Sequence, residues 1–265
     1  MFDRFNRPIN YLRISVTDRC NLRCTYCMPE EGVRLLDHSD ILSFEEIADF
    51  TRVAVSNGIT KVRLTGGEPL VRKNIVELVS MLADIDGLED LSMTTNGILL
   101  TKFAPDLKKA GLNRINISLD TVNPENYCQI TRNGNLEQVL EGIEAARKVG
   151  LEPIKVNCVL LGQPDEETRQ LKVFCEERGL KLRFIHQMNL KTGEFSTVEG
   201  GEGGNCSKCN RVRLLANGDI KPCLFSDLAY NIRKLGHQEA LNIALGNKPK
   251  NGTYNKSGEF YNIGG

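Results

Sequence analysis

The sequence contains no tryptophan, only three histidines and no long uninterrupted apolar stretch. A membrane-spanning helix needs about 20 consecutive apolar residues, so the chain offers no candidate for one. Segment 1–15 also lacks the apolar core of a secretory signal peptide. We therefore expect a cytoplasmic protein that has no membrane partner.

Net charge is also missing, because 34 Lys and Arg residues balance 34 Asp and Glu residues. A protein without an overall positive field has no long-range attraction for nucleic acid. We expect no nucleic-acid partner, and any bound anion must be held by a local cluster of cations. With 265 residues and 40% hydrophobic content, the chain can form one large domain and a smaller appended region.

Cysteine, in contrast, is plentiful, with nine residues. In a reducing compartment, clustered thiols bind metal more often than they form disulfides. Cys20, Cys24 and Cys27 have the spacing C-x3-C-x2-C. Three thiolates leave one iron of a four-iron cluster open to a non-protein ligand, whereas electron-transfer clusters have a fourth cysteine. The spacing predicts a cluster that takes part in chemistry; a zinc site or structural cysteines are the alternatives.

A second group, Cys206, Cys209 and Cys223, has the spacing C-x2-C-x13-C. Taken alone, it could be a zinc site completed by His237. Beside the first triad, it predicts another cluster, with its open iron facing a substrate. The isolated residues Cys128, Cys158 and Cys175 are expected to be buried core thiols.

Short β-rich runs alternate with helical patterns over two thirds of the chain. One helix is expected between Ser43, a residue type preferred at the N-cap, and Gly58, and another ends at Gly150. Such alternation predicts the α/β class with parallel strands. Six units are too few for a closed eight-stranded barrel, so we expect a partial, open (β/α)6 barrel. The expected strands are 11–16, 61–66, 90–96, 114–120, 153–161 and 181–188.

The pattern breaks after residue 188, where a glycine-rich stretch over 200–204 indicates a boundary. We expect a barrel domain, 1–188, and a C-terminal region, 189–265, that covers the barrel opening and carries the second cluster. In that region Asn217-Gly218 predicts a two-residue hairpin turn between two short strands, followed by a helix over 235–246.

Polar residues follow several of the expected strands. The run LTGGEPL places Gly66, Gly67 and Glu68 after the second strand, where glycines allow a ligand to approach closely and Glu68 can receive its amino group. The third and fourth strands end in Thr94, Asn96, Ser118 and Asp120, each of which is either a site residue or a helix cap.

Six cations lie on strands or beside the second cysteine group. Unpaired cations are expensive to bury, and the guanidinium fork suits phosphate. Together they predict a polyphosphate site, although ion pairing or solvation would explain any one of them. They are Arg13, Arg63, Lys155, Arg183, Arg211 and Arg213.

The run CNLRCTYC, the GGEP motif and Ser118 resemble the radical S-adenosylmethionine (SAM) superfamily. Longer motifs narrow the resemblance to the GTP 3',8-cyclase family, which opens molybdenum cofactor biosynthesis. They cover essentially the whole chain and include YLRISVTDRCNLRCTYCMP, VRLTGGEPLVRK, RINISLD, CSKCNRVRLLANGDIKPCLF and the terminal Gly264-Gly265.

The resemblance implies two [4Fe-4S] clusters, one on each cysteine triad, of which the first binds SAM and the second binds the guanine of GTP. It assigns SAM contacts to Tyr26, Gly67, Ser118 and Met188. It assigns GTP contacts to Arg13, Arg63, Thr94, Lys155, Arg211 and Arg213, with Gly66, Glu68, Asn96, Arg183, Gly264 and Gly265 as further candidates.

The implied reaction is that of a lyase: a 5'-deoxyadenosyl radical removes hydrogen from ribose C3', and the resulting carbon radical attacks guanine C8. The product is (8S)-3',8-cyclo-7,8-dihydroguanosine 5'-triphosphate. The implied partners are an electron donor for the first cluster and, downstream, cyclic pyranopterin monophosphate synthase; both a monomer and a homodimer stay open.

Two features depart from the family pattern. Only 17 residues separate Met188 from Cys206, fewer than in the family, which predicts a smaller cover over the barrel. His186 and Gln187 also replace the usual residues of strand six, and His186 is either a site residue or a barrel-interior histidine. Two other functions stay open: a radical SAM enzyme acting on another nucleotide or a peptide, and a non-catalytic zinc-binding protein.

Overall fold

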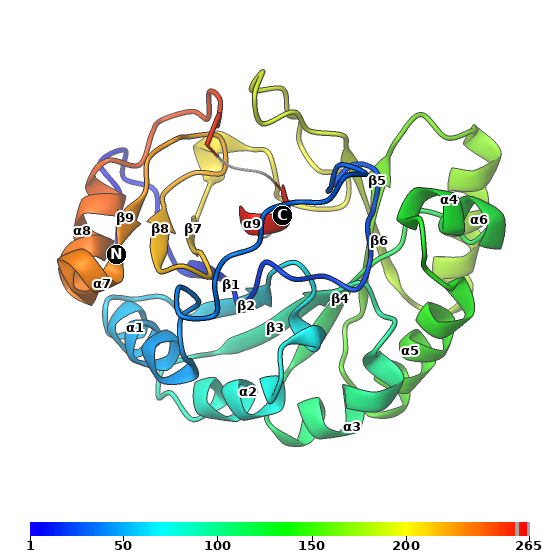
Figure 1. Cartoon of the computed structure of the whole chain (residues 1–265), viewed down its shortest axis with the longest axis horizontal. Helices are drawn as coiled ribbons and strands as arrows, with labels where there is room; N and C mark the ends of the chain where they lie inside the picture. The colour runs from blue at the N-terminus through cyan, green and yellow to red at the C-terminus, as the bar shows by residue number, and fades with distance from the viewer. Residues whose placement is uncertain (258–259, 264–265) are drawn as a thin grey trace.

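The computed structural model, which describes residues 1–257 and 260–263, contains a nine-stranded sheet (Figure 1). Its strand order is β6-β5-β4-β3-β2-β1-β7-β8-β9. The strands are β1 (Tyr11–Ser15), β2 (Lys61–Thr65), β3 (Asp90–Thr95), β4 (Arg114–Ser118), β5 (Lys155–Leu160), β6 (Lys181–His186), β7 (Arg211–Leu214), β8 (Asp219–Lys221) and β9 (Tyr230–Asn231).

Strands β1 to β6 are parallel, and helices lie between them in the chain. The sheet curves but has two free ends, so the expected α/β class and open barrel are confirmed. The helices are α1 (Phe44–Ser56), α2 (Ile75–Ala83), α3 (Leu100–Lys109), α4 (Pro124–Thr131), α5 (Leu136–Lys148), α6 (Asp165–Glu177), α7 (Ile232–Leu235), α8 (His237–Gly246) and α9 (Phe260–Ile263).

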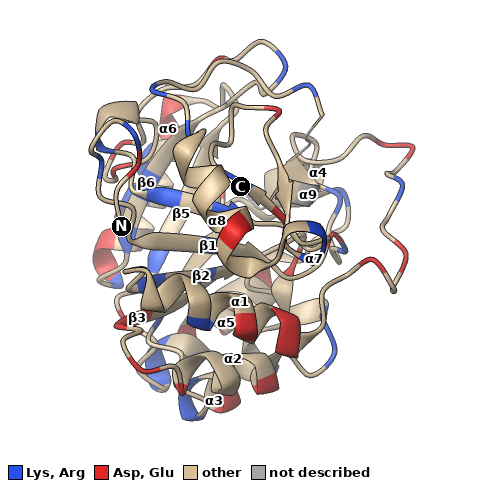
Figure 2. Ribbon diagram, turned by 90° about the vertical axis from the view of Figure 1, so that its left-hand side faces the viewer, with Lys and Arg blue, Asp and Glu red and all other residues tan. Residues whose placement is uncertain are grey.

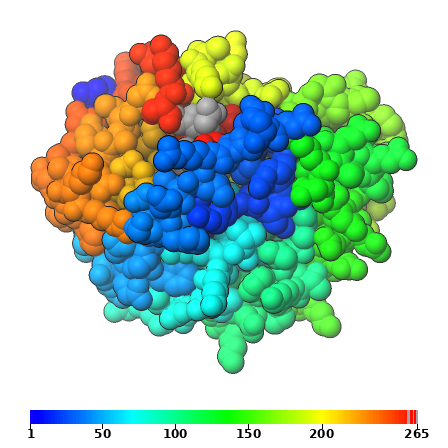
Figure 3. All heavy atoms as spheres, in the orientation of Figure 1, coloured from blue at the N-terminus to red at the C-terminus, as the bar shows by residue number. Residues whose placement is uncertain are grey.

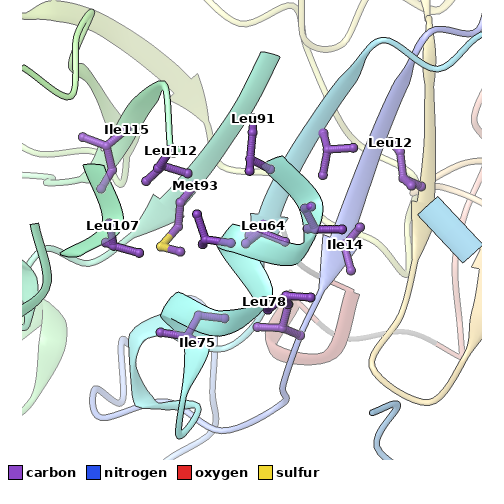
Figure 4. Packing of buried hydrophobic residues seen from close by; sticks show 14 of the residues in the cluster. Leu12, Ile14, Leu64, Ile75, Leu78, Leu91, Met93, Leu107, Leu112 and Ile115 are labelled. Carbon is purple, nitrogen blue, oxygen red and sulfur yellow. The ribbon is translucent and has the colours of Figure 1, made fainter. Parts of the chain in front are cut away.

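The two faces of the sheet differ in polarity. Alternate strand residues point to opposite faces, and one set packs under α1, α2, α3 and α5, which wrap the outside of the sheet (Figure 1). Figure 4 shows this packing, in which Ile14, Leu64 and Met93 meet Ile75 and Leu78 of α2. The other set is largely polar and faces inward.

Local signals fix the first helix. Ser43 accepts a hydrogen bond from the Glu46 amide, and the Glu46 carboxylate accepts one from the Ser43 amide, which forms a capping box. The chain leaves the helix through Gly58, whose φ of +101° suits glycine. Both expected helix boundaries are therefore confirmed.

The C-terminal region continues the same sheet. Strand β7 lies parallel to β1 on the side opposite β2, while β8 and β9 add antiparallel pairs. The expected hairpin is present, but its turn is longer than two residues, because the Leu215 amide donates to the Asp219 carbonyl and leaves 216–218 as the loop. Gly218, with φ +87°, closes this three-residue loop.

Other expectations for the chain need correction. The helix expected over 235–246 begins at His237, because Gly236 with φ +78° separates it from α7. Cys158 and Cys175 are buried as expected, but Cys128 is exposed, so its prediction as a core thiol is wrong. Among the described residues, no helix has the length and apolar content that crossing a membrane requires.

Candidate functional site

The inward face of the sheet lines a cavity of about 690 Å³, a volume typical of ligand sites. The cavity brings together the described residues that the resemblance assigns to the clusters, SAM and GTP, whereas Asp120 and His237 do not line it. Gly264 and Gly265 lie outside the described residues. The cavity is lined by Arg13, Cys20, Cys24, Tyr26, Cys27, Arg63, Gly66, Gly67, Glu68, Thr94, Asn96, Ser118, Lys155, Arg183, Met188, Cys206, Cys209, Arg211, Arg213 and Cys223.

The first cysteine triad lies in the loop that leaves the C-terminal end of β1. Gly66 and Gly67 pack directly against this loop: a Cβ atom on Gly67 would come within 2.3 Å of the Arg19 carbonyl oxygen. The Gly67 amide also donates to the Thr17 carbonyl at 2.7 Å. The two glycines therefore hold the cysteine loop close to the end of β2, whereas the sequence suggested only the approach of a ligand.

Two buried carboxylates hold other parts of this end of the cavity. Glu68 accepts hydrogen bonds from the Leu70 amide at 3.0 Å, from the Thr95 hydroxyl at 2.7 Å and from the Asn96 amide at 2.7 Å. Asp120 accepts one from the Tyr26 hydroxyl at 2.9 Å and one from the Val159 amide at 2.7 Å. Tyr26 is thereby fixed beside the triad.

The surroundings of the first triad disfavour negative charge. Burial, with smaller contributions from the neighbouring Cys20 and Asp120, raises the pKa of Cys27 to about 12. Burial, Cys27 and Asp120 also raise the pKa of Cys24 well above its ordinary range. Cys20, Cys24 and Cys27 all line the same cavity. A cationic metal group is what would stabilise three thiolates here.

Arginines occupy the middle of the cavity in direct register. Arg13 of β1 lies between Arg63 of β2 and Arg213 of β7. Arg63 and Arg213 are only 5% and 6% exposed, and the Arg213 Nε has no hydrogen-bond partner among the described residues. Like charges directly opposite each other on neighbouring strands destabilise a sheet. The arrangement therefore favours a bound anion. Figure 2 shows the basic positions on the strands and acidic ones mainly on helices and loops.

Burial is the largest cause of the lowered pKa values among these cations. Burial lowers the pKa of Arg63 to about 9, with Tyr11 opposing the shift and Arg13 and Arg114 adding smaller contributions to it. Burial followed by Arg183 lowers the pKa of Lys155 to about 8. Arg63 and Lys155 therefore stay largely protonated at neutral pH, and a polyphosphate would relieve the repulsion among the cations.

The second triad lies at the opposite end of the strands from the first triad. Cys206 and Cys209 precede β7, which runs parallel to β1, and Cys223 follows the antiparallel β8. All three therefore lie near the N-terminal end of β1, whereas the first triad follows the C-terminal end of this strand. The cavity runs from one triad to the other, with the arginines between them.

The second triad has the opposite electrostatics. Burial opposes ionisation of Cys209, but Lys248, Arg211 and Arg213 outweigh it and lower the pKa of this thiol to about 6. Cys209 is therefore a thiolate at neutral pH, which is the form that binds metal. Within residues 1–257 and 260–263, no three His, Cys, Asp or Glu side chains are arranged around one metal ion. A mononuclear zinc site needs such convergence, whereas each thiolate of a cluster binds a different iron.

Several cavity residues were missed in the sequence. Tyr11, Lys61, Arg114 and Asn157 line the cavity, and the Tyr11 ring lies 5.7 Å from the Arg13 guanidinium and 5.4 Å from that of Arg63. A signal was available, because Tyr11 and Lys61 precede Arg13 and Arg63 by two residues and so share their face of the strand.

The short segment 189–205 forms a side wall of the cavity along β6. Glu199 and Phe184 exchange two backbone hydrogen bonds, of 3.0 and 3.2 Å, and Arg183 Nε donates to the Gly200 carbonyl at 3.2 Å. His186 contacts the Glu199 carboxylate at 2.9 Å with a half-exposed side chain. His186 thus joins the strand to this wall and is not enclosed in the barrel.

Figure 3 shows the blue segment after β1 between the green βα units and the orange C-terminal region.

Comparisons of sequence identify relatives. Residues 14–175 match the model of the Radical SAM superfamily. The chain is 42% identical to a GTP 3',8-cyclase of Thermodesulfovibrio yellowstonii over 89% of this chain and 88% of that protein. It is 45% identical to a GTP 3',8-cyclase of Moorella thermoacetica over 88% of this chain and 86% of that protein.

Comparisons of structure give the same fold at low identity. SuiB of Streptococcus suis bound to S-adenosylmethionine has a TM-score of 0.66 at 17% identity, covering 89% of this chain and 68% of that chain. The protein anSMEcpe with bound AdoMet and a Cp18Cys peptide has a TM-score of 0.68 at 16% identity, covering 92% and 81%. The likeness to these two proteins concerns the fold alone.

Proposed function

The chain belongs to the radical SAM superfamily and, within it, to the GTP 3',8-cyclase family, and we propose that it converts GTP into (8S)-3',8-cyclo-7,8-dihydroguanosine 5'-triphosphate. The observation that carries this proposal is that one cavity holds a row of three arginines, two of them buried, between two cysteine triads. One triad fits a radical initiator, and the arginines fit a triphosphate.

In this proposal Cys20, Cys24 and Cys27 hold a [4Fe-4S] cluster. When bound, the cluster supplies the electron for reductive cleavage of SAM. Tyr26, Gly67, Ser118 and Met188 line the same end of the cavity and contact SAM. The hydrogen bond from Tyr26 to Asp120 fixes the aromatic ring before SAM arrives, which reduces the ordering required on binding.

GTP occupies the rest of the cavity. Arg13, Arg63 and Arg213, together with Lys155, Arg183 and Arg211, bind its triphosphate by charge-assisted hydrogen bonds. Thr94 lies on the same face as this group. Cys206, Cys209 and Cys223 hold a second [4Fe-4S] cluster that receives the guanine. The chain orients the ribose toward SAM and keeps water away from a reactive radical.

Other properties belong to the same proposal. We keep the division into a barrel domain, 1–188, and a cluster-carrying region, 189–265. We also propose a cytoplasmic enzyme supplied by an electron donor, with cyclic pyranopterin monophosphate synthase using its product. The row of arginines argues for a nucleoside triphosphate in place of an uncharged peptide, since such a peptide would not neutralise these cations.

Anaerobic incubation of the iron-loaded protein with SAM, dithionite and GTP tests the proposal. We expect 5'-deoxyadenosine and the cyclised nucleotide in equal amounts, and about eight irons per chain. Formation of 5'-deoxyadenosine without consumption of GTP would show that the substrate is another molecule. Zinc without iron would show that the protein does no radical chemistry.

A further inference from the structure

Lys248 is a buried cation close to the second triad. Its side chain is among the largest fully enclosed ones, and the residue is 1% exposed. The Nζ donates to the Arg211 carbonyl at 2.7 Å and, through a shorter bond, to the Pro222 carbonyl. Arg211 follows Cys209 by two residues, and Pro222 precedes Cys223 directly. One ammonium group therefore joins the two segments that carry these cysteines.

The positive charge of Lys248 is not balanced by a carboxylate. Both hydrogen-bond acceptors are neutral carbonyl groups, and no ion pair joins Lys248 to an acidic residue in the described part of the chain. The negative groups that act on it most strongly are Cys209 and Cys223, while Arg213 and Arg7 repel it. An unpaired buried charge costs several kcal/mol, so the expected counter-charge is the pair of thiolates or a group bound to them.

The segment that follows α8 also holds the third cysteine. Arg7, buried in an ion pair with Asp3, donates to the Cys206 carbonyl at 2.7 Å and to the carbonyls of Pro249 and Lys250 at 2.7 and 2.9 Å. In Figure 1 the N-terminal residues lie beside α8 and the orange-red segment after it. Residues 248–250 thus connect all three cysteine-bearing segments by way of two cations.

We propose that Lys248 is the positioning residue and buried counter-charge of the second triad, and that it is required for this triad to hold an anionic metal–sulfur cluster. This inference rests on the second cluster of the proposed function. A thiolate-bound cluster has a reduction potential set in part by net charge and hydrogen bonding. Removing the cation weakens retention of the cluster and lowers the potential of any cluster that stays bound.

The test compares Lys248→Met with Lys221→Met after anaerobic reconstitution. Lys221 is the control, because it is also buried and bonded to a carbonyl, but Asp227 and Asp219 act on its charge more strongly than Cys223 does. We expect Lys248→Met to retain about four irons where the wild type has about eight, with SAM cleavage at the first triad preserved. Lys221→Met should keep the wild-type iron content.

The outcomes separate the inference from the function. About four irons in the wild type would show that the protein holds no second cluster, and the inference would then be wrong. Eight irons with unchanged potentials in Lys248→Met would overturn the inference and leave the proposed function intact. Melting temperatures keep the inference testable if Lys248→Met folds poorly. They are measured for Lys248→Met alone and in combination with Cys209→Ser and Cys223→Ser. We expect Lys248→Met to lower the melting temperature less in the background without the two thiolates. An equal decrease in both backgrounds, or failure to fold in both, would contradict a counter-charge role.

Discussion

Arg13, Arg63 and Arg213 face one another at equivalent positions of three neighbouring strands. Selection for a stable sheet would not by itself place three guanidinium groups in register, because each repels the next and two of them, Arg63 and Arg213, are buried. The free protein is thus expected to be less stable than a sheet with neutral residues at these positions. Binding sites commonly sacrifice stability in this way.

Replacing Arg13 by Met tests this cost at the level of one residue. We expect the free energy of unfolding of the ligand-free protein to rise by about 1 kcal/mol, because the substitution removes repulsion from both neighbours. The same change should weaken GTP binding roughly tenfold to hundredfold through the lost charged hydrogen bonds. Denaturant unfolding and calorimetric titration measure the two effects.

Arg114 provides the control, because it also lines the cavity but forms an ion pair with Asp90. Arg114→Met should lower stability, since it leaves the Asp90 carboxylate without its partner. A loss of stability in both variants would contradict the idea that Arg13 is held in an unfavourable position.

Glu68 makes the stability of the protein depend on pH. Burial raises its pKa to about 7 despite three hydrogen-bond donors that oppose the shift, so the folded protein holds the proton more tightly than the unfolded chain. The stabilising contribution is complete below about pH 4 and disappears as the pH rises through about 7. Its full size is on the order of 3 kcal/mol.

Glu68→Gln removes this titration. We expect the difference in unfolding free energy between wild type and variant to fall as the pH is raised from 5 to 7.5. The exposed Glu45, whose pKa is lowered mainly by a backbone hydrogen bond and by Ser43, is the control. Its contribution is lost only as the pH falls below its ordinary pKa of 4.5, so Glu45→Gln should give a constant difference over the same pH range. Parallel pH profiles for wild type and Glu68→Gln would show that Glu68 is ionised throughout.

At the scale of elements, a glycine allows the segment 189–205 to pack against β6 as the side wall of the cavity. Gly200 has φ +73°, and an added Cβ would meet the Leu182 carbonyl oxygen at 2.8 Å. Gly200→Ala should therefore detach the wall, at a cost of about 1 to 2 kcal/mol from the backbone angle alone. Amide hydrogen exchange at Phe184 and Glu199 should accelerate about tenfold or more.

Gly162→Ala separates the two causes of this effect. Gly162 has a similar φ of +82° but nothing within 4 Å of an added Cβ, so it reports backbone strain without the collision. Exchange at Phe184 should stay slow in this variant. Equal acceleration in both variants would mean that the wall responds to general destabilisation.

Local patterns explain which elements the sequence could predict. The six βα strands follow from their apolar residues and spacing, and α1 follows from Ser43 and Gly58. The pairing of β7 with β1 depends on contacts between residues about 200 positions apart, which no local pattern encodes. Strand β9 and helix α9 are too short to give a periodic signal. The cysteines were recognisable by their spacing, whereas the role of Lys248 depends entirely on what surrounds it.

At the scale of the whole molecule, β1 joins the two parts of the chain. It pairs with β2 on one side and with β7 on the other. Val212, Ile220 and Leu241 of the C-terminal region belong to the same buried cluster as the barrel residues. Without β7, the edge of β1 would be exposed, and exposed edges favour aggregation. The two regions of the proposed division are therefore expected to unfold together.

The absence of tryptophan makes this expectation measurable. Single tryptophans in place of Phe103, in α3, and Tyr230, in β9, report separately on the barrel and on the far edge of the sheet, since both positions are partly buried. In denaturant, the two fluorescence transitions should have the same midpoint as the circular dichroism transition, because a shared core unfolds cooperatively. A lower midpoint for the Tyr230→Trp variant, with an unchanged barrel signal, would show instead that the region carrying the second triad unfolds first. That result would make retention of the second cluster, and not formation of the barrel, the step that limits the stability of the active enzyme.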